Sequence, residues 1–222
     1  MHIGIIAALD VEARAFGGGI GMLLGQHTYR VNVSGPGQAN AARATNELVR
    51  AGCEVLLSWG LAGGLDRALA PGDVIVAERL LTRGGHALEP DDDLVGLLLS
   101  RLAGARRGTV LSLDRPAADA REKMHLRERF EADAVDMEST AVAHVARSAG
   151  CRFLSVRAIV DPAAFEIPAA ALAGMGSDGA LSAWRTLNVV LADPSQIPPM
   201  LRLAVHYRRA LRGLRDTVKS LQ

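Results

Sequence analysis

The chain is poor in aromatic residues and in cysteine. Aromatic residues make up 4% of the 222 positions, and the only cysteines are Cys53 and Cys151. Two cysteines cannot form a disulfide framework, and each opens a short apolar run, which is typical of small buried residues in a reducing compartment. The first residues lack the basic region of a signal peptide, and no apolar run reaches the roughly 20 residues of a membrane-spanning helix. We therefore expect a cytoplasmic protein.

An excess of charge of one sign is also absent, because 25 Lys and Arg residues oppose 24 Asp and Glu residues. Such a balance gives no overall attraction to nucleic acid, so we expect no nucleic-acid partner. The six histidines show no i, i+4 pair and no cysteine neighbours, so we expect no metal site. We also expect no cofactor. The glycine-rich segment 60–64 fits neither a Walker loop nor G-x-G-x-x-G, and the chain has no G-x-S-x-G elbow.

Short apolar runs alternate with amphipathic segments along the whole chain. This alternation and the length predict one α/β domain over residues 1–222, with three αβα layers around a mostly parallel or mixed sheet. Residues 22–25 and 28–33 predict a hairpin, and 120–130 predicts a charged surface helix. The other expected strands are 3–8, 54–58, 74–77, 109–113 and 152–160, and the other expected helices are 11–16, 39–51, 91–102, 140–149, 181–191 and 200–221.

Four carboxylates stand at the expected ends of strands: Glu12, Asp136, Glu138 and Asp161. In open α/β sheets, ligands bind at the carboxyl ends of the strands. Cleavage of a glycosidic bond needs one group that protonates the leaving group and another that activates water or stabilises an oxocarbenium ion. The alternative is that these side chains only cap helix N-termini. The glycine segment 60–64 has two interpretations as well: backbone amides that approach a ligand, or a tight turn.

The expected helix 200–221 is amphipathic and basic. Met200, Leu203, Tyr207, Leu211 and Leu214 are among the residues on its apolar face, while five arginines and one lysine cover much of the rest. One interpretation is a terminal helix packed on the sheet with a solvated basic face. The other is an interfacial helix that contacts an anionic membrane or a lipid substrate.

Six motifs in order resemble the purine nucleoside phosphorylase/uridine phosphorylase superfamily, and within it the methylthioadenosine/S-adenosylhomocysteine nucleosidases. Together they cover residues 1–161, and the Met137-Glu138 and Asp161 motifs are the most diagnostic. The motifs are Ile3 to Ala8 with Glu12, Ser34 to Ala42, Gly60 to Leu65, Gly72 to Val76, Val135 to Ala143, and Arg157 to Asp161.

The resemblance implies a mixed sheet of the nucleoside phosphorylase type, a small-molecule nucleoside substrate and a homo-oligomer, with a dimer favoured. It implies that Glu12 activates the attacking water, that Glu138 binds the ribose hydroxyls, and that Asp161 protonates adenine N7. The last role agrees with chemistry, since adenine leaves poorly as an anion. The substrate-binding positions that it implies are Ala8, Gly60, Leu61, Ala62, Gly63, Pro116, Val135, Asp136, Met137 and Val160.

The chain departs from that family's pattern at four residues in or near the expected site, and in the length of one segment. Ser58 stands where phosphorylases have an arginine for phosphate, which favours hydrolysis, although Arg14 could serve in another geometry. Leu61 and Val160 replace serines, and Pro116 replaces a stacking phenylalanine. The segment between Glu78 and Asp91 is short. A shortened loop and an apolar Leu61 suit a bulky hydrophobic 5′ substituent better than a methylthio group.

We therefore expect an adenine-releasing N-ribosyl hydrolase. The outline resembles the hopanoid-associated branch of the superfamily, which implies adenosylhopane, a lipid-linked nucleoside, as substrate and peripheral membrane contact. Methylthioadenosine or S-adenosylhomocysteine is the other substrate choice. A phosphate-dependent phosphorylase and a non-catalytic nucleoside-binding relative are the alternatives, and the joint presence of Glu12, Glu138 and Asp161 argues against the second.

Overall fold

The computed structural model describes residues 2–16, 28–102, 104–174 and 182–219. One mixed sheet of eight strands forms its centre. The strands are β1 (Ile3–Ala7), β2 (Tyr29–Val33), β3 (Val55–Gly64), β4 (Val74–Thr82), β5 (Ala87–Leu88), β6 (Arg106–Ser112), β7 (Ala134–Asp136) and β8 (Arg152–Asp161). The helices are α1 (Asp10–Phe16), α3 (Gln38–Arg50), α4 (Asp92–Arg101), α5 (Ala120–Phe130), α6 (Ser139–Ala149), α7 (Ala169–Gly174), α8 (Ala183–Ala192) and α9 (Ile197–Lys219), with a 3-10 turn η1 (Pro194–Gln196) before α9.

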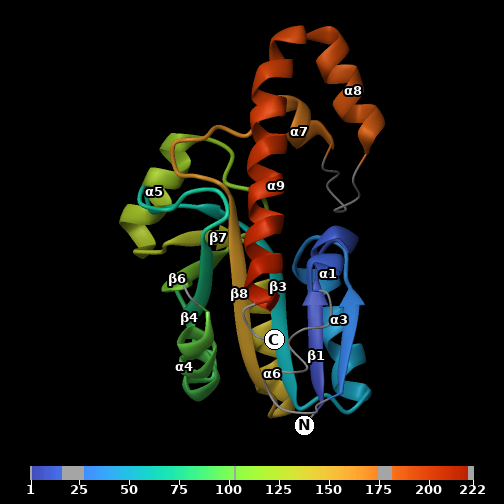
Figure 1. Ribbon diagram of the computed structural model, residues 1–222, viewed down its shortest axis with the longest axis vertical. Coiled ribbons are helices and arrows are strands. Elements are labelled where there is room, and N and C mark those ends of the chain that lie inside the picture. Colours follow the sequence, from blue (N-terminus) through green and yellow to red (C-terminus); the bar gives the residue numbers. More distant parts are fainter. Residues whose placement is uncertain (1, 17–27, 103, 175–181, 220–222) are drawn as a thin grey trace.

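The sheet closes partly on itself. Its strand order is β2-β1-β3-β7-β6-β4-β5, and β8 pairs with both β3 and β4. Strands β3, β7, β6, β4 and β8 therefore form a ring, with β1 and β2 continuing beyond β3 (Figure 1). The β3–β8 pair is parallel, whereas β3–β7 and β4–β8 are antiparallel. The expected α/β fold with a mixed central sheet is thus confirmed.

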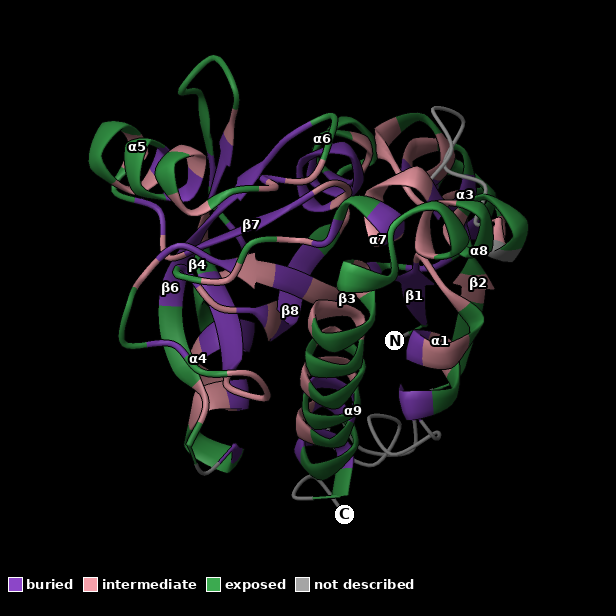
Figure 2. Cartoon of the chain, turned by 90° about the horizontal axis from the view of Figure 1, so that it is seen from above, coloured by how far each residue is buried: buried purple, intermediate pink, exposed green. Residues whose placement is uncertain are grey.

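Helices cover both faces of the sheet. Strand β1 is buried along its whole length, and its alternate side chains enter two different cores. Ile3 and Ile5 pack with residues of α1, α4 and α9, while Ile6 packs with residues of α3 and α6. A smaller third core lies under α5. Seen from above, the strands are largely buried and the helices expose their outer sides (Figure 2).

One local prediction differs from the structure, and another is only partly covered by it. Segment 60–64 was predicted either as a tight turn or as a stretch whose backbone amides approach a ligand. It is not a turn, because it is the last part of strand β3. Its backbone pairs with β8 and, at Gly63 and Gly64, with β7, and the register shifts between Ala62 and Gly63. Residues 29–33 form a strand that pairs in parallel with β1, and residues 22–25 of the expected hairpin lie outside the described residues.

The carboxy-terminal helix begins earlier than predicted. α9 starts at Ile197 rather than residue 200, so Pro198 and Pro199 lie in its first turn. Proline is tolerated there because the first backbone amides of a helix have no intrahelical acceptor. The end predicted at 221 lies outside the described residues, which end at Lys219. Among the described residues, none of the helices has the length and apolar character needed to cross a membrane.

Candidate active site

Glu12 lies in the first turn of α1, directly after β1, and is 4% exposed. One carboxylate oxygen accepts a hydrogen bond from the Leu9 amide at 2.9 Å, and the other accepts one from the Leu61 amide at 3.0 Å. The first bond caps the N-terminus of α1, as the capping interpretation predicts. The second bond involves the other oxygen and links Glu12 to β3, so capping is not the sole role of this carboxylate. Burial raises the pKa of Glu12, and nearby Arg157 and the backbone amides oppose that rise.

Two glycines of β3 make room for carboxylates. A Cβ at Gly60 would lie 2.9 Å from Glu12 Oε1 and 3.0 Å from an Arg157 terminal nitrogen. A Cβ at Gly63 would lie 3.1 Å from Asp161 Oδ2. Residues without a Cβ at these two positions therefore let Glu12, Arg157 and Asp161 approach the same strand closely.

Glu138 lies between β7 and α6 and is only partly exposed. Its carboxylate accepts hydrogen bonds from the Gly37 amide at 2.9 Å and the Met137 amide at 3.3 Å. It occupies the N-cap position of α6 but makes no side-chain bond to that helix, so the capping interpretation is wrong here. Burial, with the neighbouring Asp136 carboxylate, raises the pKa of Glu138 to about 7.

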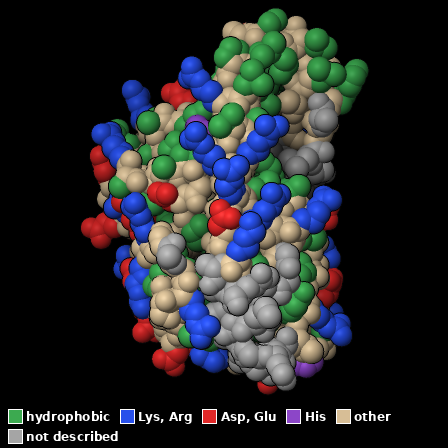
Figure 3. All heavy atoms as spheres, viewed as in Figure 1, with side chains coloured by type: hydrophobic (Ala, Val, Ile, Leu, Met, Phe, Trp, Pro, Cys, Tyr) green, Lys and Arg blue, Asp and Glu red, His purple; other side chains and the backbone are tan. Residues whose placement is uncertain are grey.

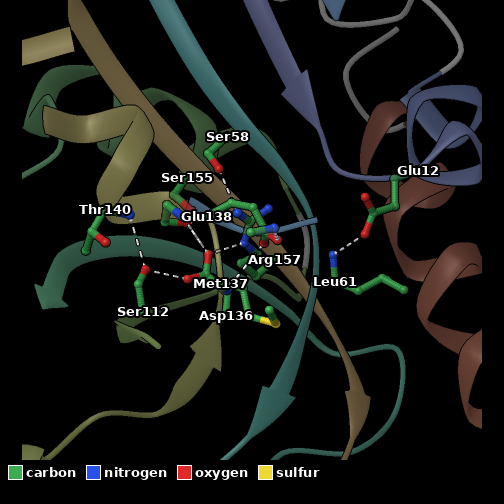
Figure 4. Close-up of polar contacts among 12 residues, drawn as sticks. Glu12, Ser58, Leu61, Ser112, Asp136, Met137, Glu138, Thr140, Ser155 and Arg157 are labelled. Carbon is green, nitrogen blue, oxygen red and sulfur yellow. Dashed lines mark hydrogen bonds and ion pairs between the residues drawn. The ribbon is translucent and has the colours of Figure 1, made fainter. Parts of the chain in front are cut away.

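Asp136 instead belongs to a buried polar network (Figure 4). Arg157 Nε donates to Asp136 at 2.7 Å, and another Arg157 nitrogen donates to Ser58 Oγ at 2.6 Å and Ser139 Oγ at 2.9 Å. Asp136 also accepts from Ser112 Oγ at 2.5 Å and from the Ser139 amide and hydroxyl, which caps α6. The capping interpretation therefore applies to Asp136, and its two oxygens are occupied within the protein.

Asp161 ends β8 and is 4% exposed. Lys123 Nζ donates to Asp161 Oδ2 at 2.5 Å and to the backbone oxygens of Pro162 at 3.1 Å and Phe165 at 2.9 Å. These three bonds use all three N–H groups of the ammonium. Burial raises the pKa of Asp161, and the Lys123 ammonium opposes that rise.

Lys123 was not predicted as a site residue, because α5 was expected to be a charged surface helix. Its side chain is fully buried, together with Leu126 of the same helix. The i, i+3 spacing of these two residues was the available signal, since positions three apart share a helix face. Arg157 was likewise not predicted as a site residue, although it begins one of the six motifs. Tyr207 of α9 was predicted only as part of an apolar face. Burial raises the pKa of its phenol to about 12, and the negative charge of the nearby Glu12 carboxylate adds to this rise.

Most of the remaining predicted positions lie on, or directly after, the strands that lead to the three carboxylates. Leu61 of β3 and Val160 of β8 are partly buried and pack on the same core as Tyr207. Ala62 is buried in the opposite core, and Val135 of β7 pairs with Gly63. Ala8 lies between β1 and α1, where its carbonyl accepts from the Gly35 amide at 3.1 Å, and Met137 precedes Glu138 on the chain.

Pro116 and Arg14 are not joined to the carboxylates by a described contact. Pro116 lies partly exposed in the connection between β6 and α5. Arg14 is exposed and its Nε donates to the Asp10 carbonyl at 3.3 Å. A groove of about 540 Å³ beside α5, lined by Met124 and Ala163 among others, contains none of the three predicted catalytic carboxylates.

Comparisons with known proteins find similar sequences and similar folds. The family model described as "Phosphorylase superfamily" matches residues 10–175. The 5′-methylthioadenosine/S-adenosylhomocysteine nucleosidase of Staphylococcus carnosus is 30% identical over 153 residues, which cover 59% of this chain and 67% of that enzyme. S-methyl-5′-thioadenosine phosphorylase 2 of Puccinia graminis is 25% identical over 144 residues, 57% of this chain and 48% of that protein.

Solved structures show the same fold. The 5′-methylthioadenosine/S-adenosylhomocysteine nucleosidase of Neisseria meningitidis, solved with methylthio-immucillin-A, aligns with a TM-score of 0.73 at 18% identity, over 99% of this chain and 97% of that one. The alignment extends through α9, which lies beyond the region that the family model matches.

Proposed function

Since the chain belongs to the phosphorylase superfamily, we propose that it cleaves the N-glycosidic bond of an adenosine-type nucleoside and releases adenine. The observation that carries the proposal is the placement of Glu12 and Asp161 against Gly60 and Gly63 of one strand, with Glu138 bordering the same Arg157 network. A nucleoside lying along the end of β3 would meet all three carboxylates.

We assign the three roles as follows. Asp161, whose raised pKa favours the protonated form, donates its proton to adenine N7, so that the base leaves neutral when the C–N bond breaks. Glu138 accepts hydrogen bonds from the ribose hydroxyls and stabilises the oxocarbenium-like transition state. Glu12 takes a proton from the water whose oxygen bonds to C1′. Lys123 is a positioning residue, because its N–H groups are used and it holds the Asp161 carboxyl in one orientation.

Hydrolysis is favoured over phosphorolysis by the charges of the cluster. Arg157 faces three carboxylates, those of Asp136, Glu138 and Glu12. Its Nε and one terminal nitrogen already donate to Asp136, Ser58 and Ser139. A phosphate dianion would therefore meet more negative than positive charge around Arg157, and this repulsion would weaken its binding.

Adenine release is expected to be independent of phosphate. The purified protein would be dialysed free of phosphate and incubated with methylthioadenosine, and adenine would be quantified by chromatography at zero and about 10 mM phosphate, well above a typical KM. Free ribose derivative is the expected second product in both cases. Formation of a ribose 1-phosphate, or adenine release only with phosphate, would establish the phosphorylase alternative.

For the 5′ substituent we propose a bulky apolar group, as in adenosylhopane, rather than a methylthio group. The support is the apolar side of the site, where Leu61, Val160 and Tyr207 are partly buried on one core and reach from β3, β8 and α9. The measurement is kcat/KM for methylthioadenosine, S-adenosylhomocysteine and adenosylhopane in detergent. A higher value for methylthioadenosine than for adenosylhopane would reject the bulky substituent and leave adenine release intact.

The acid limb of the pH profile is expected to come from Glu138. The pKa of Glu138 is raised to about 7, and the carboxylate binds hydroxyls best when ionised, so kcat/KM should fall below that pH by about tenfold per unit. The limb near pH 7 should vanish in the Glu138→Gln variant, whose residual activity is lower but flatter. If the acid limb is unchanged in that variant, it comes from the ionisation of Glu12, the other carboxylate that must be ionised, and not from Glu138.

A further inference from the structure

Helices α8 and α9 form a hairpin whose far end is unusually apolar. Of the ten large hydrophobic side chains that are exposed among the described residues, six lie between 184 and 205. Trp184 is 68% exposed, Leu191 69% and Leu201 64%. The space-filling view shows hydrophobic side chains gathered at the end of the molecule that projects beyond the sheet (Figure 3). Patches of this kind mark interaction sites on soluble proteins.

The apolar residues form one stripe on each helix. On α8, Trp184, Leu187 and Leu191 follow the i, i+3, i+7 spacing of a single face. On α9, Ile197, Leu201 and Val205 follow i, i+4, i+8. The end of the hairpin therefore presents two apolar faces.

The same exposed stripe of α9 becomes basic toward the sheet. Arg208, Arg209 and Arg212 lie three, four and seven residues after Val205, on the same side of the helix, and all three are exposed. Over 183–219 the sequence has seven basic and two acidic residues. In Figure 3, basic side chains accordingly lie just below the apolar end.

We propose that the α8–α9 hairpin docks the protein on an anionic phospholipid bilayer. The twelve-residue step from Ile197 to Arg209 spans about 18 Å of helix, so the apolar end can enter the acyl boundary while the arginines remain among the phosphates. Tryptophan at the end of the hairpin suits such an interface, because its ring is apolar and its N–H is polar. The inference stands on this surface alone and does not depend on the proposed reaction.

A bilayer fits this surface better than a second copy of the chain. A second copy of this hairpin offers these arginines few acidic partners, because segment 183–219 has seven basic and two acidic residues. Anionic headgroups would neutralise these arginines, and each basic residue near such a surface contributes about a factor of five to binding. The charge complementarity therefore selects the lipid surface.

The hairpin also leads to the candidate site. Along α9, Tyr207 follows Val205 and precedes Arg208, but its side chain packs on the core, half-buried and close to Glu12. In Figure 4, α9 passes behind Glu12. Docking through the hairpin would hold the apolar side of the site, which includes Leu61 and Val160, near the membrane surface.

The test is flotation of the full-length protein with vesicles of phosphatidylcholine alone or mixed with phosphatidylglycerol. We expect binding to the mixed vesicles at 0.1 M salt, and a reduction on the order of 100-fold in the variant with Arg208→Gln, Arg209→Gln and Arg212→Gln. A matched variant with Arg50→Gln, Arg101→Gln and Arg121→Gln removes the same charge from exposed positions elsewhere and should bind normally. Absence of binding to mixed vesicles, or equal loss in both variants, would overturn the proposal.

Tryptophan fluorescence gives a second readout. The chain has two tryptophans, of which Trp59 is fully buried and Trp184 is exposed. With mixed vesicles, the emission should shift to shorter wavelength, and brominated lipids should quench it, whereas the Trp184→Phe variant should show neither change. The variant with Trp184→Ser, Leu191→Ser and Leu201→Ser should lose vesicle binding and keep its oligomeric state in sedimentation velocity. Dissociation of an oligomer by these replacements would assign the surface to self-association instead.

Discussion

Replacing Asp161 with asparagine is expected to lower kcat for adenine release by ~10²–10⁴-fold, the range that a positioned general acid contributes. The amide has the same shape and can still accept the Lys123 hydrogen bond at its oxygen, but it holds no acidic proton for N7. The melting temperature should stay close to that of the parent protein, so that the loss reports chemistry. Steady-state kinetics on methylthioadenosine and on the preferred 5′-substituted substrate measure the effect.

A substrate whose leaving group needs no proton provides the control. The 4-nitrophenyl riboside releases a stable anion, so the Asp161→Asn variant should cleave it at nearly the parent rate. The Glu138→Gln variant should lose activity on both substrates, because ribose binding is common to them. Equal losses on both substrates in Asp161→Asn would contradict the acid role and make Asp161 a binding residue.

Replacing Arg157 with methionine is expected to cost about 3–5 kcal/mol of stability, the range for removing one partner of a buried ion pair. Arg157 and Asp136 are both almost completely buried and are joined at 2.7 Å. Without the guanidinium, Asp136 stays in the interior with a charge opposed by nothing but hydroxyls and one amide. Urea unfolding at pH 7, followed by far-UV circular dichroism, measures the difference.

Two further variants show whether the cost comes from the pair itself. Arg101→Met removes an exposed arginine of α4 and should change stability by no more than about 0.5 kcal/mol. The double variant Asp136→Asn, Arg157→Met should recover part of the loss, because it no longer buries an unpaired charge. If the double variant is as unstable as the sum of its parts, lost packing rather than charge explains the effect.

The elements that the sequence predicted well have local signals. The buried run of β1 and the charged helix α5 were placed from their own residues. The structure adds that Asp91 and Asp119 cap α4 and α5, which is a local signal as well. The convergence of Glu12 and Asp161 on one strand followed from the rule that sites lie at strand ends, although their roles came from the family resemblance.

What could not be predicted depends on pairing between distant segments. Gly60 to Gly64 look like a turn in isolation, but β7 and β8 on either side keep them extended. Lys123 looks like one charge among many on α5, and only the approach of the β8 end, 38 residues away, makes it an interior residue. Arg157 lies within an apolar run, and its burial becomes favourable once Asp136, Ser58 and Ser139 surround it.

The burial of Lys123 has a practical consequence for labelling and immobilisation. The chain has two lysines, and one of them is enclosed by three acceptors, so its amine is closed to acylating reagents. The other, Lys219, has a side chain 74% exposed at the last described turn of α9. A support coupled through Lys219 would hold α9 by one end, with Ile197 about 33 Å away along the helix axis. The apolar end of the hairpin would then point away from the support, free to meet vesicles that flow past it.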